Sequence, residues 1–286
     1  MGKKRGRELE GNDLAAADPN VDKMDEDDEE DFDMVNVDFE WFNFDPEVDF
    51  HGTKTLLRQL FDVDANLFNM SALADLVLSQ PTIGSTVKVD GKATDAYAMV
   101  TVLNVAEHAN KEPMTDVAKY LIEKARTNSS LSAIPPLIES GKQVGLVFSE
   151  RMINVPSEIA PPLYSMLIEE VEAAVEDKEP YEFTHYLILS KTYQEVESTL
   201  DGGDRKRKKA KEEALIYPFH PEDEVFQRYA QAYGSFHYTK EEDAVADSKR
   251  AFQEMGVKTF GHMILIEAGK FQEAVKAVQE YLSAPQ

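Results

Sequence analysis

The sequence predicts an α/β fold, a single domain with a mixed β-sheet flanked by helices. Two observations indicate this class. Short apolar segments rich in β-branched and aromatic residues alternate along the chain with longer segments of helical periodicity. Hydrophobic residues make up 42% of the 286 residues, which is enough for a sizeable core. We see no internal repeat, so we expect one domain over residues 34–286.

The domain is expected to begin with a strand and two helices. Apolar and polar residues alternate over 34–42, which predicts a strand with one apolar face. Leucine and phenylalanine residues three and four positions apart predict a helix over 50–61. A short second helix is expected to start at Ser71, a favourable N-cap, and to stop before Pro81.

A hairpin and a further helix follow. The segments 84–89 and 96–105 have strand composition and flank an Asp-Gly-Lys turn at 90–92, which predicts an antiparallel pair. The amphipathic spacing of 114–126 predicts a helix on the surface of the sheet.

The centre of the sheet is expected in the second half of the chain. The segment 143–152 reads as a buried strand, and 181–193 is β-branched and aromatic enough to be a central strand. Between them, 161–178 begins with prolines and has an apolar stripe, which predicts a helix. We expect six or seven strands in all. The remaining elements are strands at 214–219, 231–238 and 257–268, and helices at 220–230, 241–256 and 270–282.

Residues 1–33 are expected to form a disordered acidic tail. Nine of the twelve residues from Asp22 to Asp33 are Asp or Glu, and such a segment repels itself and buries little. The whole chain has a net charge of -24. This charge favours basic partners and opposes binding to phosphate backbones or anionic membranes. We therefore expect no direct nucleic-acid partner and no membrane partner.

The acidic tail is a candidate binding segment for a basic client protein, because its carboxylates resemble the field of a polyphosphate. The alternative is that the tail only keeps the protein soluble. Trp41, the sole tryptophan, lies close to the tail in sequence and is either a core residue or an interface anchor. The candidate client-binding residues are Asp25, Glu26, Asp27, Asp28, Glu29, Glu30, Asp31 and Trp41.

The segment 198–213 is expected to be a flexible basic insert, since it is rich in Gly, Asp and Lys and lacks apolar periodicity. A short cationic run in such a segment is typical of a nuclear-localisation signal read by an import receptor. The alternatives are a solvated loop and an intramolecular partner of the tail. The residues of the run are Arg205, Lys206, Arg207, Lys208, Lys209 and Lys211.

The sequence offers little for catalysis, and we assign no catalytic, cofactor-binding or metal-binding residue. The chain has no cysteine, no glycine-rich phosphate loop and no Gly-x-Ser-x-Gly motif. The best metal-like cluster runs from His220 to Glu224, and Pro and carboxylates at a helix start explain it without a metal. His185 lies in an apolar strand and is expected to be a structural, hydrogen-bonded imidazole.

The segments 35–61, 145–171 and 219–226 resemble the BCCIP family, and the resemblance covers about residues 34–284. It implies a fold similar to the GCN5-related acetyltransferases. The acetyl-CoA motif of that fold, Gln/Arg-x-x-Gly-x-Gly/Ala between a strand and a helix, is missing. The corresponding stretch after the strand 144–149 contains prolines and no glycine, so it offers no amide cradle for a pyrophosphate.

The resemblance also implies a function. Fungal members are similar to nuclear, non-enzymatic chaperones of a basic large-subunit ribosomal protein, and they assist nuclear export of a phosphatidylinositol phosphate kinase. We therefore expect a nuclear protein that shuttles with the cytoplasm and uses no cofactor. Two alternatives remain open: a scaffold for DNA-repair or cell-cycle partners, as animal members suggest, and a cryptic acetyltransferase.

Overall fold

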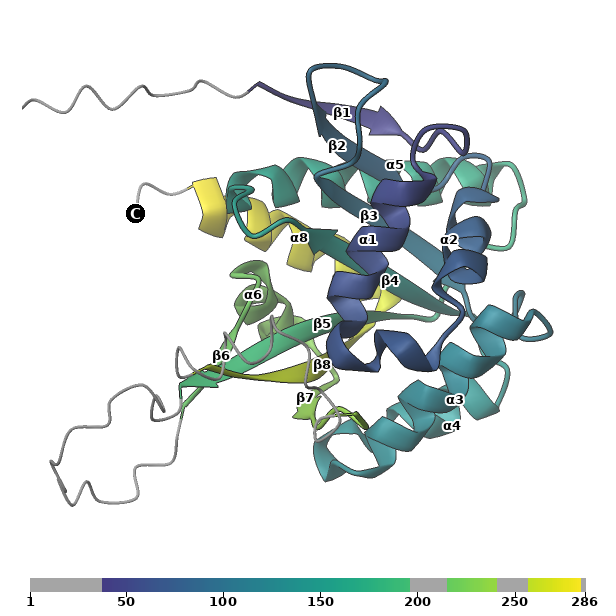
Figure 1. Cartoon of the computed structure of the whole chain (residues 1–286). Coiled ribbons are helices and arrows are strands. Elements are labelled where there is room, and N and C mark those ends of the chain that lie inside the picture. Colours follow the sequence, from purple (N-terminus) through teal and green to yellow (C-terminus); the bar gives the residue numbers. More distant parts are fainter. Residues whose placement is uncertain (1–37, 196–214, 241–256, 284–286) are drawn as a thin grey trace, which may run out of the picture. The chain divides into compact units, whose positions relative to one another are not determined.

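The computed structural model describes residues 38–195, 215–240 and 257–283. In these residues the strands form one eight-stranded sheet in the order β1-β2-β3-β4-β5-β8-β7, with β6 paired to β5 (Figure 1). The strands are β1 (Phe39–Asn43), β2 (Ser85–Val89), β3 (Ala98–Asn104), β4 (Val144–Arg151), β5 (His185–Glu195), β6 (Ile216–Pro218), β7 (Ala232–Phe236) and β8 (Val257–Glu267).

Helices cover both faces of the sheet. Figure 1 shows α1 and α2 on one side of the strands and α5 and α8 on the other. The described helices are α1 (Phe50–Phe61), α2 (Met70–Leu78), α3 (Glu112–Arg126), α4 (Ile134–Glu139), α5 (Ala160–Glu176), α6 (Glu222–Tyr229) and α8 (Ala268–Ser283), with short 3₁₀ turns η1 (Asp62–Leu67), η2 (Ser129–Leu131) and η3 (Ser157–Ile159). Within this part of the chain, none of the helices combines the length and hydrophobicity needed to cross a bilayer.

The central strands are buried on both faces, and alternate residues supply two separate cores. On β8, Met263 and Leu265 pack with α1, α2 and α3, whereas Ile264 and Ile266 pack with α5 and α8. This follows from the period of two in a strand, which directs successive side chains to opposite faces. The long apolar runs of the central strands are therefore explained by helices on both sides.

The β4–β5 pair is parallel, whereas every other pair in the described sheet is antiparallel. Pairing of β4 with β5 ends at Phe148 and Leu189, although both strands continue. Farther along, β5 pairs with β6 on that side, from Thr192 to Gln194. The carboxyl ends of β4 and β5 therefore separate, and space opens between them.

The predicted fold class is confirmed: the chain folds around a single mixed sheet flanked by helices. The sheet has eight described strands rather than six or seven, because all eight segments of strand character pair into it. Helix α4 was not predicted, because its prolines at 135 and 136 obscure a helical pattern that tolerates proline in its first turn. The predicted helix at 241–256, the tail and the basic insert lie outside the described residues.

Candidate functional site

A cavity of about 720 Å³ opens beside the carboxyl ends of β4 and β5. Glu150 and Lys191 lie in its wall, and Ile153 and Phe219 line it with apolar surface. Crevices outside the carboxyl ends of parallel strands are preferred ligand sites in open α/β sheets. The cavity is thus a candidate functional site by its place in the fold.

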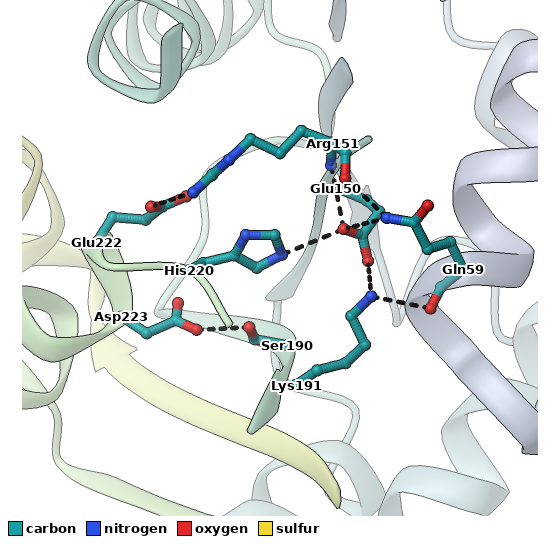
Figure 2. A network of polar contacts seen from close by, with 8 residues as sticks. All are labelled: Gln59, Glu150, Arg151, Ser190, Lys191, His220, Glu222 and Asp223. Carbon is teal, nitrogen blue, oxygen red and sulfur yellow. Dashed lines mark hydrogen bonds and ion pairs between the residues drawn. The ribbon is translucent and has the colours of Figure 1, made fainter. Parts of the chain in front are cut away.

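The Glu150 carboxylate is the centre of a buried polar network (Figure 2). One oxygen is 2.6 Å from Lys191 Nζ, and the other accepts a 3.0 Å hydrogen bond from Gln59 Nε2 and lies 3.2 Å from His220 Nε2. Lys191 Nζ also donates to the Gln59 carbonyl at 3.0 Å. These groups come from β4, β5, α1 and the loop before α6, so the network ties four parts of the chain together.

The network holds Glu150 in its charged form. Burial by itself would raise the pKa of this carboxyl, but Lys191 and His220 outweigh burial and lower the pKa to about 2. The pKa of an unperturbed glutamate is higher, so ionised Glu150 stabilises the fold above about pH 4.5, and this contribution is lost as the pH falls towards 2. At neutral pH the carboxylate is paired and is a poor general base.

Arg151, next on β4, forms a second buried ion pair. Its guanidinium donates through two nitrogens to the two carboxylate oxygens of Glu222, at 2.5 and 3.2 Å. Burial disfavours the guanidinium charge, but the Glu222 carboxylate raises the pKa of Arg151. Such a bidentate contact fixes the orientation of the two side chains as well as pairing their charges. Here it attaches the start of α6 to the end of β4.

Asp223 behaves differently from Glu222. It accepts a 2.5 Å hydrogen bond from Ser190 Oγ and is almost fully buried. Burial raises the pKa of Asp223 to about 7, against a lowering effect from His220. Asp223 therefore changes its protonation near neutral pH, whereas Glu150 does not.

The predicted metal-like cluster is part of this network. Pro221 precedes α6 and the carboxylates fall in its first turn, as the helix-start explanation predicted. Two of these carboxylates also have side-chain partners, since Glu222 contacts Arg151 and Asp223 contacts Ser190. Within the described residues, no group of three or more His, Asp and Glu side chains is arranged to hold a metal ion.

The start of α5 bears on the predicted lack of a pyrophosphate cradle. This helix begins at Ala160, and Pro161 and Pro162 occupy its first turn. An anion site at a helix N-terminus uses backbone N–H groups, and each proline removes one. Two of the first three residues of α5 therefore have no N–H to donate.

Trp41 lies away from the cavity, because β2 and β3 separate its strand from β4. At 37% exposure it is neither a core residue nor fully solvated. Its cross-strand partner Val87 is fully buried. The candidate residues from Asp25 to Asp31 and the basic run from Arg205 to Lys211 lie outside the described residues.

Sequence reasoning missed Glu150, Arg151, Lys191 and Gln59. A signal was available: Lys191 interrupts the apolar strand β5, and Glu150 and Arg151 end the apolar strand β4. Charged residues inside apolar strands are rarely buried unless paired. His185 starts β5 partly exposed, with its Nδ1 3.0 Å from Thr184 Oγ1, in line with a hydrogen-bonded structural role.

Comparison with known proteins gives a consistent result. A family model described as BCCIP matches residues 34–226. Protein BCP1 of Gibberella zeae is 75% identical over the full length of both chains, and Protein bcp1 of Schizosaccharomyces pombe is 43% identical over 89% of this chain and 93% of its own. The crystal structure of BCP1 from Saccharomyces cerevisiae is similar at a TM-score of 0.60 and 27% identity, covering 90% of this chain and 94% of that one. These names specify no reaction.

Proposed function

This chain belongs to the BCCIP family, and from that premise we propose that it is a nuclear chaperone and transport factor for a basic protein of the large ribosomal subunit. It would keep this client soluble until ribosome assembly and would also assist nuclear export of a phosphatidylinositol phosphate kinase. The basic run from Arg205 to Lys211 would be read by an import receptor, and the protein would shuttle between nucleus and cytoplasm.

The distribution of negative charge is the observation that carries this proposal. Residues 1–33 account for -8 of the net charge of -24, so the remaining residues carry -16. The domain is therefore anionic in its own right. On α5, for example, Glu169, Glu172 and Glu176 are exposed at positions that share one side of the helix. Such a surface attracts Lys- and Arg-rich proteins and repels RNA, which suits a protein that shields a ribosomal protein before RNA binds it.

We further propose that the protein acts by binding and not by catalysis. Two buried charged groups in the cavity wall are paired, with Glu150 held by Lys191 and Arg151 by Glu222. A nucleophile or base needs a free or activated group, and these pairs are instead suited to holding strands and a helix in place. The Glu150–Lys191 pair also bridges the space between the separating ends of β4 and β5.

The cavity supports a second candidate, a cryptic acetyltransferase, because it lies where β4 and β5 separate. Acetyl-CoA titration followed by thermal unfolding distinguishes the two. A ligand that binds only the folded state raises its stability, so no shift in Tm at about 1 mM acetyl-CoA is expected. Appreciable stabilisation, with acetyl transfer to a lysine substrate, would favour the enzyme.

The decisive experiment uses the full-length chain and its client. Purification from nuclear extract, followed by mass spectrometry, should recover a basic large-subunit ribosomal protein. That protein should scatter light when alone and stay soluble with the chain, and the protection should weaken between about 50 and 300 mM salt. A partner list without Lys- and Arg-rich proteins would refute the proposal. A client that is soluble alone would favour the alternative of a scaffold for DNA-repair or cell-cycle partners.

The tail has its own test. A matched variant replaces the seven carboxylates from Asp25 to Asp31 with Asn and Gln, which keeps the length and removes the charge. Its affinity for the client should fall and become less dependent on salt. If its binding and its salt dependence equal those of the unaltered chain, the tail does not contact the client.

A further inference from the structure

The strand β1 lies at one end of the sheet. It pairs with β2 on one side, and no strand among the described residues pairs with its other side. At the other edge of the sheet, a side chain contacts the backbone of the edge strand β7: Asn128, next to η2, donates a 2.9 Å hydrogen bond to the Ser235 carbonyl. An open edge is a template for an added strand, and proteins commonly block it.

The register shows which backbone groups of β1 face the open side. The Val87 carbonyl accepts a 2.8 Å hydrogen bond from Tyr97 N–H, so Val87 directs its backbone groups towards the β3 side of β2. Backbone groups alternate between the two sides of a strand, and residues directly opposite in an antiparallel pair point either both inward or both outward. Trp41, opposite Val87, therefore directs its N–H and C=O to the open edge, as do Phe39 and Asn43.

Negative charge surrounds this edge. Asp38, Glu40 and Glu47 are exposed on or next to β1. The neighbouring cation Lys92 lies 3.2 Å from Asp45 and is thereby neutralised. The helix α5 adds to the field, because the Glu170 carboxylate accepts hydrogen bonds from Gly84 N–H and Ser85 Oγ at the start of β2, both at 2.7 Å.

The acidic sequence of the tail is tethered to the same strand. Asp33, the last of the nine carboxylates, is six residues before Phe39, and six residues span at most about 20 Å. The acidic run therefore directly precedes this strand in the sequence. Trp41 offers a half-exposed indole on the same strand, and tryptophan is the best aromatic partner for Lys and Arg.

We propose that the open edge of β1 binds an extended Lys- and Arg-bearing segment of a basic partner protein as an added β-strand. Backbone groups of Phe39, Trp41 and Asn43 would pair with the segment, and Trp41 would contact one of its cationic side chains. The inference rests on the proposed basic partner and adds where it binds. A second copy of this chain is a poorer occupant, because pairing two such edges brings Asp38 and Glu40 of both copies together.

The test uses a synthetic peptide of about twelve residues in which Lys alternates with Val, long enough for one strand. Its control has the same number of lysines and Pro at every third position, which interrupts hydrogen bonding along both edges of a strand. The alternating peptide should change the fluorescence of Trp41, the sole tryptophan, and should protect the amides of residues 39, 41 and 43 from hydrogen exchange. The proline peptide should bind more weakly and should protect none of these amides.

Two variants locate the contact. Asn43→Pro removes one outward N–H and keeps Trp41, and it should weaken the alternating peptide about three- to tenfold, the worth of one hydrogen bond. Trp41→Ala should weaken it by a similar factor, as measured by anisotropy of a labelled peptide. Tyr233→Ala removes an exposed aromatic from β7 at the other end of the sheet and should have no effect. Thermal unfolding checks that each variant is folded.

Several outcomes overturn the proposal. One is equal peptide affinity of Asn43→Pro and the unaltered chain, both folded. Another concerns the chain without peptide. If the amides of residues 39–43 are already protected from hydrogen exchange, and removal of residues 1–33 abolishes this protection, the tail and not a partner protein occupies the edge. A dimer that Asn43→Pro dissociates would make a second copy the occupant. If the ribosomal client binds Asn43→Pro at full strength, this inference fails and the proposed function stands. If the intact chain binds no ribosomal protein but still pairs with the peptide, the proposed function fails and the β1 edge remains a binding site for basic segments.

Discussion

Glu150 at the end of β4 and Lys191 on β5 form an ion pair of 2.6 Å at the point where the two parallel strands separate. Both side chains are almost fully buried. The pair therefore replaces the backbone hydrogen bonds that the strands no longer share. A buried ion pair of this kind is costly to break, because the remaining charge stays in a medium of low polarity.

Removal of one partner should be more damaging than removal of both. Lys191→Met leaves the Glu150 carboxylate buried with fewer partners and should reduce the free energy of unfolding by about 3–5 kcal/mol. The double variant Glu150→Leu/Lys191→Met should regain most of this loss. Urea unfolding of the two variants measures the difference. Equal destabilisation by the single and double changes would show that packing, and not charge, determines the effect.

The Arg151–Glu222 contact should depend on the shape of the guanidinium. Arg151→Lys keeps the charge but loses the bidentate geometry, and it should lower the free energy of unfolding by about 1–2 kcal/mol. The matched control is Arg126→Lys, since Arg126 pairs with Glu139 in an exposed position and should cost less than about 0.5 kcal/mol. Denaturant unfolding of both variants tests the contrast, which fails if the two costs are the same.

Asp223 should make the fold less stable as the pH rises towards neutrality. Its pKa is raised to about 7 from an unfolded value near 3.8, so the folded state binds more protons in this window. Stability from this group is therefore present at low pH and lost as the pH rises through 7. Asp223→Asn should be more stable than the unaltered chain by a few kcal/mol at about pH 8, with a smaller gain at about pH 5. A gain that does not change with pH would contradict this assignment.

Nuclear accumulation should depend on the basic run. Replacement of Arg205, Lys206, Arg207, Lys208 and Lys209 with Ala should shift a fluorescent fusion to the cytoplasm, because an import receptor reads clustered cations. Replacement of the exposed, isolated Lys119, Lys142 and Lys276 should leave its location unchanged. The variant should also be combined with changes at Lys3, Lys4, Arg5 and Arg7, a second basic patch. Persistent nuclear fluorescence in the combined variant would rule out both patches as the signal.

Much of the fold could be predicted from local patterns. The alternation at 84–89 and 96–105 with a turn between them gave a hairpin that the structure confirms, and the apolar run at 181–193 is the central strand β5. The patterns were sufficient because burial on a helix or strand face requires a period of 3.6 or two in the sequence itself. They failed for α4, where two prolines conceal the helix.

The candidate cavity could not be predicted in this way. The residues from His220 to Glu224 were noticed as a group, but their partners Glu150 and Lys191 were not. Nothing local to His220 indicates that a carboxylate seventy residues earlier lies 3.2 Å away.

The sequence by itself determined the fold class, the anionic character of the chain and its two charged segments, because composition and periodicity express these directly. It also determined the family, through the resemblance of segments 35–61, 145–171 and 219–226. Only the tertiary structure decided which charges are buried together and which strand edge is open. Those properties depend on strand order and register, which bring distant residues side by side through contacts that no local pattern encodes.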